Sequence, residues 1–161
     1  MVRRMRAIRS VLAATLACAL APGVAAVQDG AGSVQESAAA ALDKGTGDDW
    51  IDARLHDMDD YAARHRDAFI DEIVRYLEAP RPLVDEALGE GGMRPGDVYY
   101  ACALARASGR PCRTLMDAWR DAAGDWESVA ARLELEPDAR LHPRIRDEMR
   151  ASYRRWARPI D

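Results

Sequence analysis

The chain has 161 residues, with 23 basic and 27 acidic side chains and a formal net charge of −4. This length allows one compact domain with a tail, and a hydrophobic fraction of 48% excludes a wholly disordered chain. Of the basic residues, 22 are Arg and one is Lys, and Asn is absent. This bias is typical of a genome rich in G and C, so the arginines by themselves do not indicate phosphate binding.

The first 26 residues have the three parts of a secretory signal peptide. A stretch of ten apolar residues, 11–20, is followed by small residues up to Ala26 and is preceded by four arginines: Arg3, Arg4, Arg6 and Arg9. Ten residues make a helix of about 15 Å, half of what a bilayer core of about 30 Å requires. We therefore expect cleavage after Ala26, a periplasmic or secreted protein, and no transmembrane span in the mature chain.

Residues 27–46 are rich in Gly, Ala and Ser, and we expect them to form a flexible leader. Loss of the four N-terminal arginines changes the net charge from −4 to −8. A chain this acidic is not attracted to nucleic acid, and export separates it from nucleic acid. We therefore expect no nucleic-acid partner.

Residues 47–161 carry helical signals and are expected to form a single domain. Within 47–78, apolar side chains recur at intervals of three, four and seven residues, which predicts one long helix or two short ones. Proline and glycine delimit further helices, which we expect from Pro82 to Leu88, from Pro95 to Ser108, from Pro111 to Gly124, from Asp125 to Pro137, and from Pro143 to Pro159. No segment alternates as a strand does. The sequence therefore predicts an all-α fold, a compact bundle of five or six helices.

The first predicted helix carries the nearest approach to a metal site. Acidic and imidazole side chains share one face of it at intervals of three or four residues: Asp49, Asp52, His56 and Asp60, with Asp59 as an alternative to Asp60. Such side chains can bind Zn²⁺ or a related ion. HExxH and the EF-hand calcium loop are both absent. The competing interpretation is a solvated helix face, and we expect no cofactor.

Charge is distributed unevenly along the chain. Residues 47–90 contain 13 acidic and 5 basic side chains, whereas residues 138–161 contain 7 basic and 4 acidic ones. One interpretation is that the basic last helix packs beside the acidic first helix. The other is that the last helix binds an anionic membrane or an envelope polymer, for which the candidate residues are Arg150, Arg154 and Arg155.

Export to an oxidising compartment raises the question of a disulfide between Cys102 and Cys112. The segment 109–111 predicts the turn of a helical hairpin, with Cys102 about two turns before it. At 1.5 Å per residue, the two Cα atoms could lie further apart than the roughly 7 Å that a disulfide tolerates. The sequence leaves open whether these cysteines pair or are two buried thiols.

Catalytic signatures are absent: the chain contains no GxSxG, P-loop, GxGxxG or CxxCH motif. His65 lies on the apolar stripe of 47–78 and is expected to be a core histidine, and His142 is expected in the loop before the last helix. Residues 111–135 resemble a helix-turn-helix in outline, but the second helix is acidic and would repel phosphate. We interpret this segment as a corner between two helices that serves the packing of the domain.

The segment from Arg94 to Cys112, RPGDVYYACALARASGRPC, is followed by Gly124-Asp-Trp126 and a short helix that contains Leu133. This order of Pro-Gly-Asp, Ala-rich helix, Ser-Gly, hydrophobic helix and Gly-x-Trp resembles a family of small exported all-α bacterial proteins without a characterised activity. The resemblance covers residues 94–135, about a quarter of the chain. It departs at Leu135-Glu136, where the family has Leu-Gly. It implies helices and export, and no activity.

These observations favour an exported, non-catalytic binding or interaction module. Its expected partner is an envelope protein, an envelope polymer or an anionic membrane surface. The alternative is a metal-binding protein or metal-dependent hydrolase that uses the Asp/His face of the first helix. A purely structural role is the third hypothesis.

Overall fold

The computed structural model describes residues 45–160. This part of the chain forms α-helices and one π-helical turn without any strand, which confirms the all-α prediction. The predicted signal peptide and nearly all of the predicted leader lie outside the described residues. The elements are α2 (Asp49–Arg64), α3 (Arg66–Tyr76), α4 (Arg81–Leu88), α5 (Pro95–Ser108), α6 (Cys112–Asp121), α7 (Trp126–Arg132), η1 (Pro137–Leu141) and α8 (His142–Arg155).

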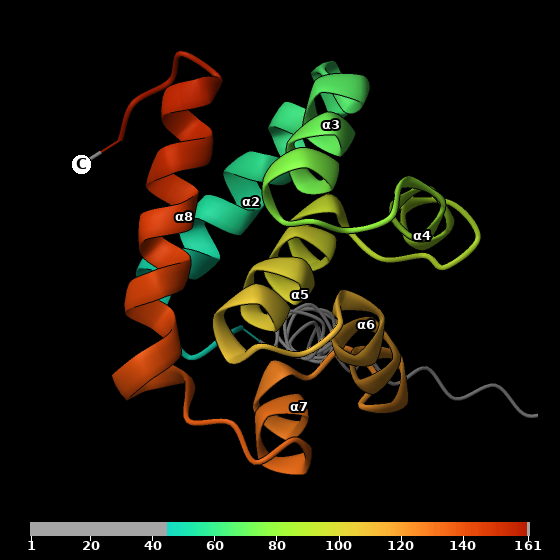
Figure 1. Cartoon of the computed structure of the whole chain (residues 1–161), viewed down its shortest axis with the longest axis vertical. Coiled ribbons are helices and arrows are strands. Elements are labelled where there is room, and N and C mark those ends of the chain that lie inside the picture. Colours follow the sequence, from blue (N-terminus) through green and yellow to red (C-terminus); the bar gives the residue numbers. More distant parts are fainter. Residues whose placement is uncertain (1–44, 161) are drawn as a thin grey trace, which may run out of the picture.

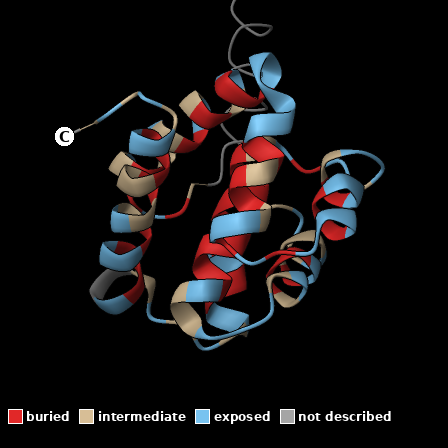
Figure 2. Ribbon diagram, turned by 45° about the horizontal axis from the view of Figure 1, so that its top comes forward, coloured by how far each residue is buried: buried red, intermediate tan, exposed pale blue. Residues whose placement is uncertain are grey.

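Helix α5 runs through the middle of the molecule, with α2 and α8 on one side and α4 and α6 on the other (Figure 1). Every residue from Gly96 to Ala105 is buried, and the ribbon of this helix is red over most of its length in Figure 2. A helix that is apolar on all faces must be surrounded by other elements. Its many small side chains let those elements approach closely.

The start of α5 packs directly on α2. A Cβ atom on Gly96 would lie 2.7 Å from the carbonyl oxygen of Leu55, so a larger residue would push the helices apart. The N–H of Gly96 donates to Oδ1 of Asp59 at 2.6 Å, which satisfies one of the N–H groups left unpaired at a helix start. Burial raises the pKa of this carboxyl above its ordinary value.

Asp97 connects the start of α5 to α7. Its side chain is 3% exposed, and it accepts hydrogen bonds from Nε1 of Trp126 and from Nε of Arg94, each at 3.0 Å. The Pro-Gly-Asp and Gly-x-Trp segments of the sequence therefore meet in space, and their role here is to hold helices together.

Of the two forms predicted for residues 47–78, one long helix or two short ones, the structure has two helices, which are divided at His65. The backbone of this residue leaves the helical region, with φ −138° and ψ 51°. Residues 45–160 therefore contain seven α-helices, where five or six were expected. His65 is exposed, and its ring centre lies 5.0 Å from that of Tyr61. The expectation of a core histidine is wrong because the break takes position 65 out of the apolar stripe.

Helices α5 and α6 form a tight hairpin closed by a disulfide. Gly109 adopts the left-handed conformation (φ 73°), which favours glycine at a helix end, and its N–H bonds back to the carbonyl of Ala105. The chain reverses there, so Cys112 returns against α5. The Cα atoms of Cys102 and Cys112 are 4.6 Å apart, and their sulfurs are bonded. The sequence predicted this turn, but the spacing of the cysteines did not show how closely Cys112 returns to α5, so the pairing was left open.

Helix α8 lies beside α2 and is joined to it and to α3 by ion pairs. Arg146 pairs with Asp48, Arg158 with Asp57 at 2.8 Å, and Arg155 with Glu72. The interpretation that the basic last helix packs beside the acidic first helix is thereby confirmed. In the region 45–160, no helix is long and apolar enough to cross a membrane.

Candidate functional site

The Asp/His face predicted on α2 does not assemble into a metal site. Oδ1 of Asp52 accepts the N–H of Thr46 at 2.8 Å, and Nδ1 of His56 lies 2.9 Å from the carbonyl oxygen of Asp52. Asp49 and Asp60 are exposed. Among the described residues, no group of three or more His, Cys, Asp and Glu is placed to bind a metal ion. The geometry therefore supports a solvated face, part of which caps neighbouring backbone.

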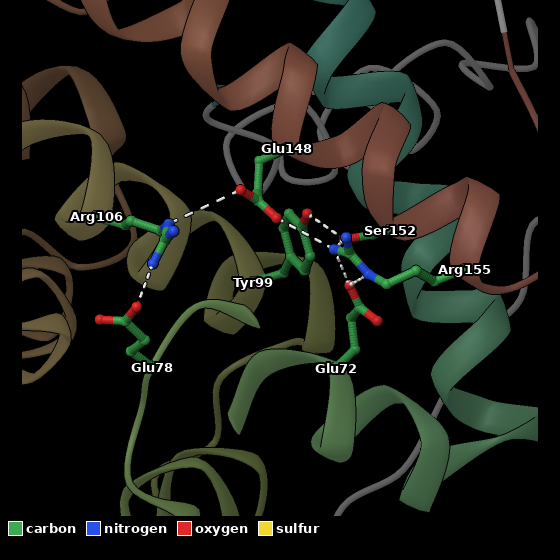
Figure 3. A network of polar contacts seen from close by, with 7 residues as sticks. All are labelled: Glu72, Glu78, Tyr99, Arg106, Glu148, Ser152 and Arg155. Atoms are coloured by element: carbon green, nitrogen blue, oxygen red, sulfur yellow. Dashed lines mark hydrogen bonds and ion pairs between the residues drawn. The ribbon is translucent and has the colours of Figure 1, made fainter. Parts of the chain in front are cut away.

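The three arginines predicted for an anionic surface do not form one patch. The guanidinium of Arg155 contacts two carboxylates, Glu72 of α3 and Glu148 of α8 (Figure 3). The side chain of Glu72 is 4% exposed, so Arg155 compensates a buried carboxylate. The carboxylates raise the pKa of Arg155 further above its ordinary value, against the opposing effect of burial. Arg155 therefore does not belong to the candidate surface.

Arg150 and Arg154 lie one turn apart on α8. Arg154 is exposed. Arg150 bonds to Asp147 at 3.2 Å, and its Cζ atom lies 5.0 Å from the centre of the Trp50 ring on α2. Of the predicted residues, Arg150 is the one that the fold places in a cluster.

That cluster is centred on Trp50, which is partly buried. The Cζ atoms of Arg54, Arg150 and Arg146 lie 4.8, 5.0 and 6.0 Å from the centre of its ring. Each distance is within the roughly 6 Å over which a guanidinium is attracted to an aromatic face. We call these four residues the Trp50 surface.

The guanidinium groups of the Trp50 surface differ in their partners. Arg54 forms no ion pair within the described residues, whereas Arg146 pairs with Asp48 and Arg150 with Asp147. The Asp147 side chain is 81% exposed, so its attraction for Arg150 is strongly screened. In the same part of the chain, the Nε–H groups of Arg54 and Arg146 are buried without an acceptor. Because they are buried, a ligand in solution does not reach these two N–H groups, and they do not support an anion site.

A cavity of about 420 Å³ opens beside the Trp50 surface. It is lined by Gly47, Asp48, Asp49, Trp50, His142 and Arg146. The cavity offers space next to the stacked arginines, and its walls come from the starts of α2 and α8.

A buried polar chain fixes these two helix starts. Oδ1 of Asp48 accepts the N–H groups of Trp50 and Ile51, each at 3.1 Å, and Oδ2 lies 3.5 Å from Nδ1 of His142. Nε2 of His142 lies 3.0 Å from the hydroxyl of Tyr100. This hydroxyl belongs to a residue that is 1% exposed, so no substrate can reach it. The chain positions Trp50 and does not form a catalytic triad.

Sequence reasoning missed three members of this surface and the place of His142. Trp50 and Arg54 are four residues apart on α2, and Arg146 and Arg150 are four apart on α8, so each pair shares a helix face. This four-residue spacing was the signal in the sequence that could have identified the Trp50 surface. His142 is the first residue of α8 rather than a loop residue, and it is 3% exposed.

Comparison with known proteins identifies no relative: no family model, curated protein or solved structure matches the chain.

Proposed function

We propose that the protein is an exported, non-catalytic binding module that holds an anionic polymer at the Trp50 surface. The observation that carries this proposal is the gathering of three guanidinium groups around one indole ring, one of them without a carboxylate partner in the described residues. Guanidinium groups form strong, directional hydrogen bonds with carboxylate and phosphate oxygens. Polymers that carry such groups are available to a protein exported to the cell envelope.

A polymer is favoured over a membrane surface. An amphipathic helix binds a bilayer by inserting an exposed apolar face. The apolar side chains of α8 are buried in the core, with Ile145, Met149 and Tyr153 at most 1% exposed. Among the described residues, the large hydrophobic side chain that is exposed is Tyr76, on α3. The surface therefore offers charge and hydrogen bonds but no apolar face for lipid.

The test is a binding titration of the mature protein with two probes, a linear polyphosphate and polygalacturonate. The R54Q/R150Q variant removes two guanidinium groups from the Trp50 surface. The R64Q/R154Q variant is the matched control, because it removes the same charge from exposed arginines of the same two helices. We expect R54Q/R150Q to weaken binding about tenfold or more, since each charged contact contributes roughly 1 kcal/mol, and R64Q/R154Q to change it less than about twofold.

Two results would overturn the proposal. One is the absence of binding of either probe at low ionic strength, where surface electrostatics are strongest. The other is an equal loss in both variants, which would show that net charge rather than the Trp50 surface determines binding. Vesicles of phosphatidylglycerol provide a third arm: tighter binding to them than to either polymer would assign the surface to a membrane and contradict the polymer proposal.

A further inference from the structure

A second cavity lies on another side of the domain, between the end of α3, helix α4 and the α5–α6 turn. Its volume is about 650 Å³, within the range of about 300–1,000 Å³ that small-molecule sites occupy. Its lining includes the apolar residues Leu77, Leu83 and Ala105 and the arginines Arg106, Arg110 and Arg113. No residue of the Trp50 surface lines it, so it is separate from the proposed polymer site.

The floor of this cavity is apolar and fixed. Leu77, Leu83 and Ala105 are 4%, 3% and 2% exposed, and they come from three different segments. Cys112 adds its disulfide to Cys102, which ties α6 to α5 at this point. The floor therefore exists before any ligand arrives, which lowers the entropy cost of binding.

The rim of the cavity is cationic, although residues 45–160 as a whole carry 18 basic and 23 acidic side chains. The lining contains three arginines and one glutamate, Glu78. Arg106 lies between two carboxylates, Glu78 at 2.7 Å and Glu148 at 3.8 Å (Figure 3), so of the three arginines it is the least available to an anion. The charge available to a ligand must come from the other two arginines.

Arg110 and Arg113 have weaker partners. Arg110 donates to the backbone carbonyl of Leu133 at 2.8 Å, which leaves its positive charge uncompensated. Arg113 lies 3.8 Å from Glu86, and both side chains are more than half exposed, so water screens this pair strongly. An anionic group at the rim would meet two guanidinium groups that are still able to bind it.

Glu78 has a left-handed backbone conformation at this rim. Glu78 follows the end of α3 with a positive φ of 57°, a conformation that favours glycine and costs other residues roughly 1 kcal/mol or more. A glutamate at this position supplies the carboxylate that holds Arg106. Ala123, Glu134 and Ala157 have the same conformation after α6, α7 and α8, so it is a common way to end a helix here and does not by itself mark the cavity.

We propose that this cavity binds a small amphiphilic carboxylate, an anion with an aliphatic body. The body would lie against Pro80 and Pro111, the exposed apolar residues of the lining, above the buried Leu77, Leu83 and Ala105. The carboxylate would bind Arg110 and Arg113. The rim repels a cationic head group, and a polyanion without an aliphatic body gains nothing from the apolar floor. The cavity and the Trp50 surface therefore select ligands of different chemistry.

The experiment is a calorimetric titration with decanoate below its micellar concentration, with decylamine as the probe of opposite charge. The wild-type protein should bind decanoate at least tenfold more tightly than decylamine. R110Q/R113Q should weaken decanoate binding at least tenfold. The matched control is R75Q/R132Q, which removes two exposed arginines paired with Asp71 and Asp121 elsewhere on the surface and should change the affinity less than twofold. Thermal unfolding checks that both variants remain folded.

Three outcomes would overturn this proposal: no binding of decanoate, equal binding of decylamine, or unchanged binding in R110Q/R113Q. Sedimentation gives a fourth, because a dimer that dissociates in R110Q/R113Q would assign the cavity to a second copy of the chain. The two proposals can be tested independently. R54Q/R150Q should leave decanoate binding unchanged, and R110Q/R113Q should leave polyphosphate binding unchanged.

Discussion

Helices α5 and α8 are attached to the domain by different forces. Helix α5 is surrounded by apolar contacts, a disulfide and the buried bond from Trp126 to Asp97. Helix α8 buries apolar side chains as well, but ion pairs also attach it and the residues that follow it to α2, its N-cap and α3, through Arg146, Arg155 and Arg158. Salt and pH act on partly exposed charges and hardly on apolar packing. They should therefore weaken the attachment of α8 and leave that of α5 nearly unchanged.

The largest effect is expected at Asp97. The substitution Asp97→Ala leaves the buried indole N–H of Trp126 without an acceptor and should lower the free energy of unfolding by about 3 kcal/mol. Asp117→Ala, at an exposed position on α6, should cost less than about 0.5 kcal/mol. Urea unfolding measures both. Similar values for the two variants would show that the start of α5 does not depend on this bond.

Loss of the disulfide is expected to have the next largest effect. The bond closes a short loop, with a sequence separation of 10, so C102S/C112S should lose about 2–3 kcal/mol of stability. If this loss of stability is the same at low and at high salt, the disulfide holds α5 independently of charge, as its apolar contacts do. A loss that depends strongly on salt would contradict this interpretation.

The pair of Arg155 and Glu72 is the strongest polar contact expected on the α8 side. Arg155→Gln leaves a carboxylate whose side chain is 4% exposed without its cation and should cost about 2 kcal/mol. The double variant E72Q/R155Q removes the unpaired charge and should recover part of this loss. Unfolding of the single and double variants measures this coupling, and simple additivity would argue against an ion pair in solution.

The smallest effect is expected at Asp57, which is partly exposed. Burial alone would raise the pKa of this carboxyl, but hydrogen bonds from Arg158 and Tyr153 lower it below the ordinary value of 3.8. A lowered pKa stabilises the fold above the ordinary pKa, and this contribution is lost as the pH falls through the pKa of the folded state. Asp57→Asn should therefore cost at most about 1 kcal/mol at neutral pH. The difference in melting temperature should close below pH 3.8; a gap that stays constant would exclude the ionised pair as its cause.

Local signals in the sequence predicted helix α5 well, because Pro95 and Gly109 delimit it on their own. They left open whether residues 47–78 form one helix or two, and they placed His65 in the core, because nothing in the neighbouring residues distinguishes a break from a continuous stripe. The disulfide was left open because it depends on the turn at Gly109, whose geometry the spacing of the cysteines does not reveal.

The candidate site was predicted less well than the fold. Arg150 was found because it lies on a basic helix, but Arg155 was misplaced because its partner, Glu72, is 83 residues away in the chain. The Trp50 surface is built from α2 and α8, and their approach results from packing through the whole domain. Residue spacing within one helix shows which side chains share a face but not what that face meets.

The most direct test of the Trp50 surface is a nitrogen–proton NMR titration of the indole N–H groups with polyphosphate. The chain has four tryptophans, and three of them, Trp119, Trp126 and Trp156, lie outside the surface. We predict that the Trp50 signal shifts in a saturable manner while the other three stay in place. A shift of all four signals together, or a shift confined to the other three, would contradict the proposal that this surface binds the anion.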